Sequence, residues 1–381
     1  MLMRPHPVLT RFGSVVNTNQ GVQYDCGRLK HGFTRGLEPV STGKPFSLPF
    51  IALLIFAFFL GACSRGAEDA TGKAANPNHL PLTQPANLEA VQLQDGDPLH
   101  VVATTSIVAD VIANVGGDAI TLNTIVPRMT DPHGYQLTPG DLRTLHDADV
   151  VFINGLGLEE SLEQSLVQLP DDIPVVSLSE GIQLRELNPE QVAPVADVDP
   201  ETRAPAGTDP HVWFDPLNII IWNENAAQSL AALDPGNAAA FVANAAAFHA
   251  QIEDLHIWIL AQFEEIPQAD RKFVTDHLLM GYFAQRYEFE ISDALLPAFS
   301  SAASPSAREL AAVQDSIHKL GVKAIFVGIT GNRQLAEQMA RDTSAVVIPL
   351  YTGSLSEIQG PASTYLAFMQ YNVRAIATAL K

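Results

Sequence analysis

The segment DPGNAAAFVANAAAFHAQIEDLHIWILAQFEEI, residues 234–266, is the strongest structural signal in this chain. It contains no Pro or Gly after Gly236, and its larger apolar side chains recur every three or four residues. Those side chains are Phe241, Val242, Phe248, Ile252, Leu255, Ile259 and Phe263. The spacing predicts one uninterrupted helix. A helix of about 28 residues is about 42 Å long, so it can bridge two lobes as a rigid spine.

Predicted strands and helices alternate on both sides of this helix. Before it, apolar strands are expected at residues 99–104, 119–127, 149–155 and 173–179. After it, strands are expected at residues 272–277, 289–297, 322–329 and 345–350. Such alternation with helices is typical of a parallel sheet. We therefore predict an α/β fold of two lobes, each a mainly parallel sheet flanked by helices, joined by one long rigid linker helix.

The same pattern predicts the domain boundaries. The N-terminal lobe should occupy residues 98–233, the linker helix 234–267 and the C-terminal lobe 268–381, with a separate core in each lobe. Thr138 followed by Pro139 predicts a helix start, and Ser304 predicts another. The stretch 188–207 is rich in Pro, Asp and Ala, which predicts a surface loop.

The N-terminal region has the features of an export signal. An apolar core, Phe50 to Leu60, is too short for a confident bilayer span and suits a signal peptide. It ends in Leu60-Gly61-Ala62-Cys63, which resembles the bacterial lipobox, where cleavage precedes a cysteine that carries lipid. Residues 1–62 are thus expected to be a leader plus lipoprotein signal peptide, and residues 63–97 a flexible tether. The alternative is an ordinary signal or short anchor helix with an incidental cysteine.

Residues 1–44 leave two explanations open. A lipoprotein signal begins a few residues before its apolar core, whereas this core is preceded by more than forty residues. Either the leader is unusual or the true start of translation lies further along the chain.

Charge and cysteine content narrow the range of partners and sites. The chain has 381 residues and a formal net charge of −20, which argues against nucleic acid as a partner because phosphate binding requires a basic surface. Its only cysteines are Cys26 and Cys63. The mature chain would therefore have no disulfide, and any transition-metal site must use histidine and carboxylate.

A short motif that ends in histidine occurs three times. TDPH appears at residues 130–133 and 208–211, and TDH at residues 275–277. Ligands bind near the carboxyl ends of strands in open α/β sheets, so His133 and His211 should lie on one wall of an interlobe cleft and His277 on the other. Three converging imidazoles would bind a divalent transition metal, zinc before manganese. The alternative for each motif alone is an ordinary turn with a surface histidine.

Each of these histidines has an aspartate one or two residues before it. These aspartates are Asp131, Asp209 and Asp276. A carboxylate so placed can accept a hydrogen bond from the ring nitrogen that does not face the metal, which would hold the ring in one tautomer.

The body of the chain, residues 99–380, resembles the metal-binding lipoproteins that deliver zinc or manganese to ABC transporters. The resemblance rests on TTSIVADVIANVGGD, DPHGYQLTPGDLRTLHDADVVFINGLGLE, DPHVWFDP, HLLMGYFAQRYEFEI, PSARELAAVQDSIHKLGVKAIFV and TYLAFMQYNVRAIATAL, in this order. It implies two lobes joined by a rigid helix, and a metal in the cleft held by His133, His211 and His277.

The chain departs from the family pattern in its C-terminal lobe. Many members have an Asp ligand in the turn that reads YTGSLS here, where Gly353 stands in its place, and many have Glu where Gly328 stands. Water or a residue from another loop would have to complete the metal coordination. A carboxylate at residue 353 is expected to shift selectivity towards manganese, at the cost of placing Asp where glycine has a positive φ.

Together these features predict an extracytoplasmic, lipid-anchored monomer, in the periplasm or on the outer face of the cell membrane, that captures zinc or manganese and delivers it to an ABC permease. Two alternatives remain. The first is a hydrolase that uses a three-histidine zinc and a bound water, although the chain has no H-E-x-x-H motif. The second is a surface adhesin with a structural metal.

Overall fold

The computed structural model describes residues 80–94, 96–185, 208–296, 298–301 and 305–381. Cys63, the signal peptide, residues 63–79 of the predicted tether and the loop 188–207 lie outside these ranges. The rest of the predicted tether, from residue 80, does not behave as a flexible tether, because Leu80 is buried and the backbone N–H of Thr83 donates to the carbonyl of Val175. The chain divides into two compact units, Met1–Ala70 and Thr71–Lys381, and the fold described below belongs to the second. None of the helices within the described ranges combines the length and apolar composition that a bilayer crossing requires.

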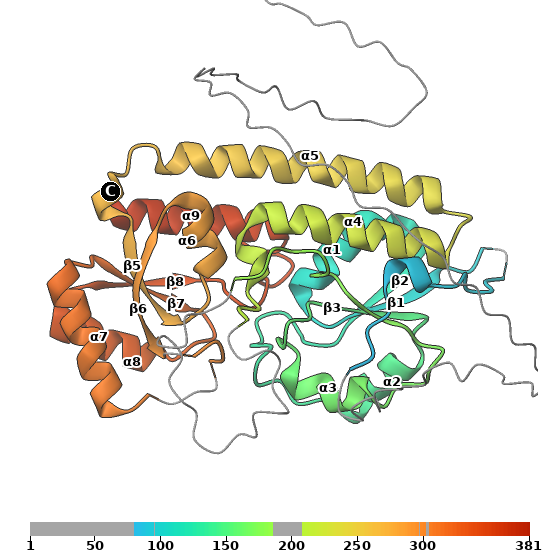
Figure 1. The fold of residues 1–381 in the computed structure, drawn as a ribbon, viewed down its shortest axis with the longest axis horizontal. Coiled ribbons are helices and arrows are strands. Elements are labelled where there is room, and N and C mark those ends of the chain that lie inside the picture. Colours follow the sequence, from blue (N-terminus) through green and yellow to red (C-terminus); the bar gives the residue numbers. More distant parts are fainter. Residues whose placement is uncertain (1–79, 95, 186–207, 297, 302–304) are drawn as a thin grey trace, which may run out of the picture. The chain divides into compact units, whose positions relative to one another are not determined.

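The N-terminal lobe is built on a four-stranded parallel sheet. Its strands are β1 (Leu99–Ala103), β2 (Ile120–Thr124), β3 (Val150–Ile153) and β4 (Val175–Ser177), in the order β2-β1-β3-β4. The helices of this lobe are α1 (Ser106–Gly116), α2 (Pro139–His146) and α3 (Glu160–Leu166) (Figure 1). As predicted, Thr138 caps α2, and Asp141 completes a capping box with it.

The C-terminal lobe repeats this arrangement. Its strands are β5 (Lys272–His277), β6 (Glu290–Leu296), β7 (Ala324–Gly328) and β8 (Val346–Leu350), all parallel, in the order β6-β5-β7-β8. Its helices are α6 (Gly281–Tyr287), α7 (Ala307–Leu320), α8 (Arg333–Thr343) and α9 (Tyr365–Leu380). The predicted α/β fold class, with two parallel sheets flanked by helices, is confirmed.

One long helix, α5 (Ala238–Phe263), lies along both lobes and contacts α1 of the first and α9 of the second (Figure 1). Helix α4 (Pro216–Leu233) is followed, after a short turn, by α5, and the two pack side by side. The 26 residues of α5 make it about 39 Å long. Of the seven apolar positions used to predict this helix, six are buried, whereas the Val242 side chain is 59% exposed and does not belong to the buried face.

The core is not divided as the sequence suggested. One continuous cluster of buried side chains joins both lobes, and alternate residues of a strand face different clusters. Val101 on β1 and Phe326 on β7 belong to this shared core, whereas Val102 and Val327 face separate clusters, one in each lobe. Each lobe thus keeps one cluster of its own, but the expectation of two independent cores is wrong, because α1, α4, α5 and α9 pack against one another and join the inner sides of both lobes in one cluster.

Candidate metal centre

The repeated motif forms the same local turn at both of its TDPH sites. The Asp131 Oδ1 atom accepts a hydrogen bond from the backbone N–H of His133 at 3.0 Å. The Asp209 Oδ1 atom accepts the equivalent bond from the N–H of His211, also at 3.0 Å. The intervening proline restricts the aspartate to extended conformations, so this two-residue turn presents its histidine in a defined direction.

The three histidines meet between the lobes. His133 follows β2, His211 precedes α4, and His277 is the last residue of β5. One ring nitrogen from each lies within 4.8 Å of the other two, and the Nε2 atoms of His133 and His211 are 3.2 Å apart. Two imidazoles bound to one zinc at about 2 Å place their nitrogens about 3.3 Å apart. The spacing therefore suits a shared divalent metal, and within the described residues no other group of His, Cys, Asp and Glu side chains has this arrangement.

Two of the aspartates hold the rings as well as the backbone. Asp209 Oδ1 lies 2.9 Å from Nδ1 of His211, and Asp276 Oδ1 lies 2.9 Å from Nδ1 of His277. These contacts engage Nδ1 and leave Nε2 of each ring for a metal. Both histidines are almost fully buried, at 1% and 5% exposure, so their orientation is also fixed by packing.

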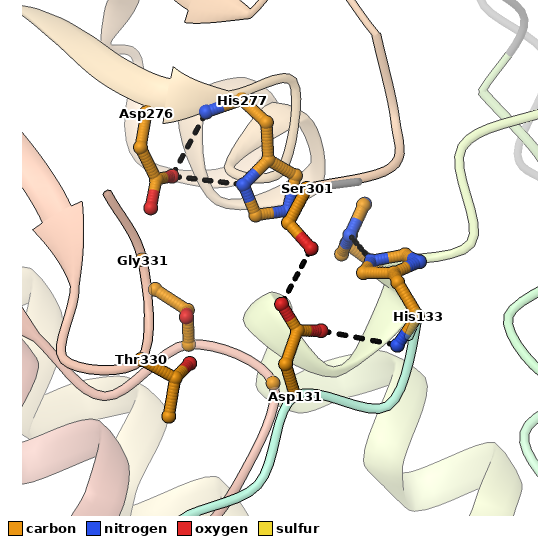
Figure 2. Close-up of a pocket in the computed structure, with 10 residues that line it drawn as sticks. Asp131, His133, Asp276, His277, Ser301, Thr330 and Gly331 are labelled. Carbon is orange, nitrogen blue, oxygen red and sulfur yellow. Dashed lines mark hydrogen bonds and ion pairs between the residues drawn. The ribbon is translucent and has the colours of Figure 1, made fainter. Parts of the chain in front are cut away.

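Asp131 differs from the other two aspartates. Its Oδ1 atom accepts from the backbone of His133, not from the ring, and its Oδ2 atom accepts from the Ser301 hydroxyl at 2.5 Å (Figure 2). In this structure the Asp131 carboxylate contacts the His133 backbone and Ser301 in place of the His133 ring, because the Asx turn directs it towards the backbone. Asp131 thus links the turn before His133 to a loop of the C-terminal lobe.

Burial keeps the imidazoles of His133 and His211 neutral. Burial, followed by repulsion from His211 and His277, lowers the pKa of His133 to about 3. Burial also lowers the pKa of His211 well below its ordinary value. Burial opposes ionisation of Asp276, but its contacts with His277 outweigh this effect, and its pKa is lowered. At neutral pH His133 and His211 therefore offer uncharged imidazoles, which is the form that binds metal.

Glycines border the cavity where the family pattern has carboxylates. A Cβ atom added to Gly353 would lie 2.7 Å from Cδ of Pro132, and one added to Gly328 would lie 2.5 Å from Oγ1 of Thr352. Gly353 does not have a positive φ, so the expected backbone cost of Asp at this position is wrong. The obstacle at residue 353 is the Pro132 ring, which lies against Gly353 at the edge of the small cavity that Gly353 lines.

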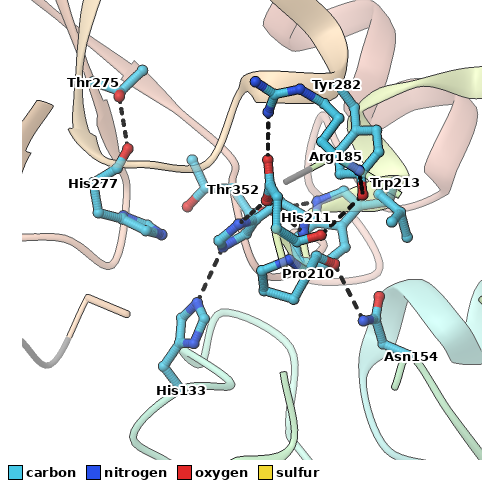
Figure 3. A network of polar contacts seen from close by, with 12 residues as sticks. His133, Asn154, Arg185, Pro210, His211, Trp213, Thr275, His277, Tyr282 and Thr352 are labelled. Atoms are coloured by element: carbon cyan, nitrogen blue, oxygen red, sulfur yellow. Dashed lines mark hydrogen bonds and ion pairs between the residues drawn. The ribbon is translucent and has the colours of Figure 1, made fainter. Parts of the chain in front are cut away.

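The structure also brings together residues that the motifs did not indicate. Asn154, which follows β3, donates from Nδ2 to the carbonyl of Pro210 at 3.2 Å, next to His211. Trp213 donates from Nε1 to the carbonyl of Thr352 at 3.0 Å, and so ties the His211 segment to the opposite lobe (Figure 3). The location of Asn154 at the carboxyl end of a parallel strand was the one sequence signal for its role.

Comparison with known proteins identifies the family. Residues 101–379 match the family described as zinc-uptake complex component A, periplasmic. The chain belongs to this family. Its members and curated relatives are substrate-binding components of transporters, so the predicted resemblance and the prediction that the protein is not an enzyme are confirmed, and the hydrolase alternative is set aside.

Three similar proteins illustrate the family. The manganese-binding lipoprotein MntA of Halalkalibacterium halodurans is 31% identical over 288 residues, which cover 75% of this chain and 90% of MntA. A manganese-bound periplasmic metal-binding protein from Candidatus Liberibacter asiaticus superimposes with a TM-score of 0.65 at 27% identity, covering 74% of this chain and 100% of that one. The periplasmic zinc-binding protein TroA of Treponema pallidum has a TM-score of 0.65 at 26% identity, covering 74% and 99%.

Proposed function

We propose that this protein is an extracytoplasmic substrate-binding lipoprotein that captures a divalent transition metal between its lobes and delivers it to an ABC permease. The convergence of His133, His211 and His277 carries this proposal, since their ring nitrogens lie within 4.8 Å of one another. The proposal includes the N-terminal lobe at residues 98–233, the linker helix at 234–267 and the C-terminal lobe at 268–381. It also includes a lipid on Cys63 and a monomeric state.

Zinc is the proposed cargo in preference to manganese. The names of similar proteins include both metals, so similarity alone does not select one. The chemistry of the donors favours zinc, because three imidazoles are nitrogen ligands and manganese prefers more oxygen ligands. The glycines at residues 328 and 353 support the same choice, since they remove the carboxylates that would suit manganese.

Alanine substitution of each histidine tests the site. We expect His133→Ala, His211→Ala and His277→Ala each to weaken zinc affinity at least tenfold, because each removes one of few ligands. Competitive titration with a chromogenic chelator measures the affinity. His146→Ala is the matched control, since His146 is an exposed histidine at the end of α2. Three histidine variants that bind zinc as the parent does would refute the assignment.

Growth under zinc limitation tests delivery to a permease. A strain that lacks this protein should grow poorly with a zinc chelator, and the parent gene should restore growth whereas the His211→Ala gene should not. Equal growth of all these strains would favour the adhesin alternative, in which the metal has a structural role and uptake does not depend on the protein.

A further inference from the structure

Arg185 reaches the metal centre through Asp209. Its Nη1 atom donates to Asp209 Oδ2 at 2.8 Å, and the other carboxylate oxygen, Oδ1, holds both the backbone and the ring of His211. The Asp209 side chain is 1% exposed and the Arg185 side chain 25%, so the carboxylate is shielded from water whereas the arginine is partly open to it. One buried carboxylate therefore joins the Arg185 guanidinium to a predicted metal ligand.

The same arginine also contacts the opposite lobe. Its guanidinium lies over the ring of Tyr282 on α6, 5.6 Å from the ring centre (Figure 3). The Tyr282 hydroxyl accepts from the backbone N–H of Arg185 and donates to the carbonyl of Asp209, both at 3.1 Å. Helix α6 begins shortly after His277, so these contacts connect the segments that bear two different metal ligands.

A glycine at the start of α6 makes room for this arrangement. A Cβ atom added to Gly281 would lie 1.3 Å from Nη1 of Arg185 and 2.6 Å from Oδ2 of Asp209. The ion pair thus occupies the space that a side chain at residue 281 would take. Arg185, Asp209, Gly281 and Tyr282 form a packed group that we call the interlobe clasp.

We propose that Arg185 is a positioning residue for metal binding, and that the interlobe clasp sets the spacing between His211 and His277. The proposal rests on the function proposed above. Arg185 holds Asp209, Asp209 orients His211, and Tyr282 with Gly281 holds the pair against the helix that follows His277. Removing the guanidinium would leave a buried carboxylate without its cation, which would then shift and release the His211 ring.

A second interlobe ion pair provides a matched control. Arg286 on α6 donates to Asp215 Oδ2 at 2.8 Å, and Asp215 caps the start of α4. This pair joins α6 to the N-terminal lobe as the clasp does, but neither member binds a metal-site histidine in the described part of the chain. Arg286→Ala therefore measures the effect of losing an interlobe ion pair alone.

Cobalt(II) supplies the readout, because its visible spectrum reports coordination geometry and its affinity can be measured by competition with zinc. We expect Arg185→Ala to weaken cobalt and zinc binding at least tenfold and to alter the cobalt spectrum. Arg185→Lys should recover part of the metal affinity and part of the parent spectrum. An ammonium supplies the positive charge but lacks the planar guanidinium that can form two parallel hydrogen bonds. Arg286→Ala should lower the melting temperature while leaving spectrum and affinity as in the parent.

A substitution in α6, on the opposite lobe, tests the same contact independently. Gly281→Ala should displace the guanidinium and reproduce the spectrum of Arg185→Ala, and the double variant should resemble either single variant, because both disrupt one contact. Tyr282→Phe, the mildest change, should shift the spectrum in the same direction. It replaces Arg185→Ala as the test variant if Arg185→Ala does not fold.

The possible results distinguish a failure of the clasp proposal from a failure of the proposed function. Parent-like cobalt spectra and affinities in the Arg185 and Gly281 variants, with the histidine variants defective, would overturn the clasp and leave the metal site standing. Equal losses in Arg286→Ala and Arg185→Ala would also overturn it, since the effect would then be general. A parent protein that binds neither cobalt nor zinc would overturn both proposals.

Discussion

The Pro132 ring limits the size of the side chain that residue 353 can carry. Pro132 belongs to the first TDPH motif, and its ring lies where the side chain of residue 353 would begin, with 2.7 Å from Cδ to the added Cβ. A proline ring cannot rotate away, so the contact can be relieved only by moving the turn that carries His133. The absence of a carboxylate at residue 353 is therefore coupled to the histidine turn.

This coupling predicts the effect of Gly353→Asp. Overpacking costs about 1–3 kcal/mol, so the single variant should bind zinc no more tightly than the parent, and about tenfold more weakly if the His133 turn moves. In the double variant with Pro132→Ala, the carboxylate can enter, and the preference should shift towards manganese. Competitive zinc and manganese titration of both variants, with Pro132→Ala alone as control, measures this. Tighter zinc binding by Gly353→Asp alone would contradict the steric argument.

The residues that could be predicted are those whose signals are local. The TDPH repeat and the TDH strand end marked the three histidines, because each motif carries its own turn or strand. Arg185 could not be found in this way, since its partners Asp209 and Tyr282 are 24 and 97 residues away in the chain. Only the folded arrangement brings those three together.

At the scale of elements, the sequence predicts one helix start correctly and another wrongly, and it places one exposed residue on a buried helix face. Thr138 caps α2 as predicted, but α7 begins after Ser306, not Ser304, because Ser306 forms a capping box with Glu309. That serine-to-glutamate spacing was present in the sequence. Val242 has the right period for the buried face of α5 and is nevertheless exposed, since the neighbouring elements do not cover it.

A contact between α1 and α9 gives the fold a dependence on pH. Asp110 on α1 accepts from the backbone N–H of Tyr365, at the first turn of α9, at 2.8 Å. Burial raises the pKa of Asp110 from 3.8 to about 6, against the opposing effects of this hydrogen bond and of Arg128. The folded state then binds the proton more tightly than the unfolded state, so the contribution of Asp110 to stability falls as pH rises from about 4 to about 6.

Asp110→Asn should remove this dependence, because an amide accepts the same hydrogen bond without titrating. We expect the melting temperature of the variant, relative to the parent, to increase between about pH 4 and pH 6 and then to level off. Thermal unfolding at several pH values measures the difference, and Asp171→Asn, at an exposed position, is the control. A difference that does not vary with pH would show that Asp110 is not the group responsible.

At the scale of the whole described body, the shared core predicts cooperative unfolding. The continuous buried cluster includes β1 of one lobe, β5 of the other, and α5 between them. Disrupting one lobe would expose apolar surface of the other, so the two should not unfold separately.

We therefore expect one thermal transition for the metal-free protein. Zinc at about 100 times its dissociation constant should add about 2.7 kcal/mol and raise the transition by about 4 °C. Differential scanning calorimetry measures both quantities. His211→Ala should show one transition that the same zinc concentration raises by about half as much or less. Two resolved transitions would mean that each lobe unfolds with its own core.

The attachment of the molecule to a membrane is predicted from Cys63. Cys63→Ser should abolish lipid labelling and release the protein from the membrane fraction, because a lipid on this cysteine is the proposed anchor. Metabolic labelling with a fatty acid and fractionation of cells measure the two effects. Persistent labelling of the serine variant would place the lipid elsewhere, and an unlabelled protein that stays in the membrane fraction would favour a short anchor helix.

The three histidine rings are held by different contacts, and this difference predicts the order in which their bonds to a metal break. Asp209 and Asp276 engage Nδ1 of His211 and His277, so each of these imidazoles can form only one linkage isomer with a metal. His133 has no carboxylate on its ring among the described contacts and is the most exposed of the three. Its ring can turn without breaking a second bond, so we expect the bond to His133 to open first, and a competing ligand to enter from that side.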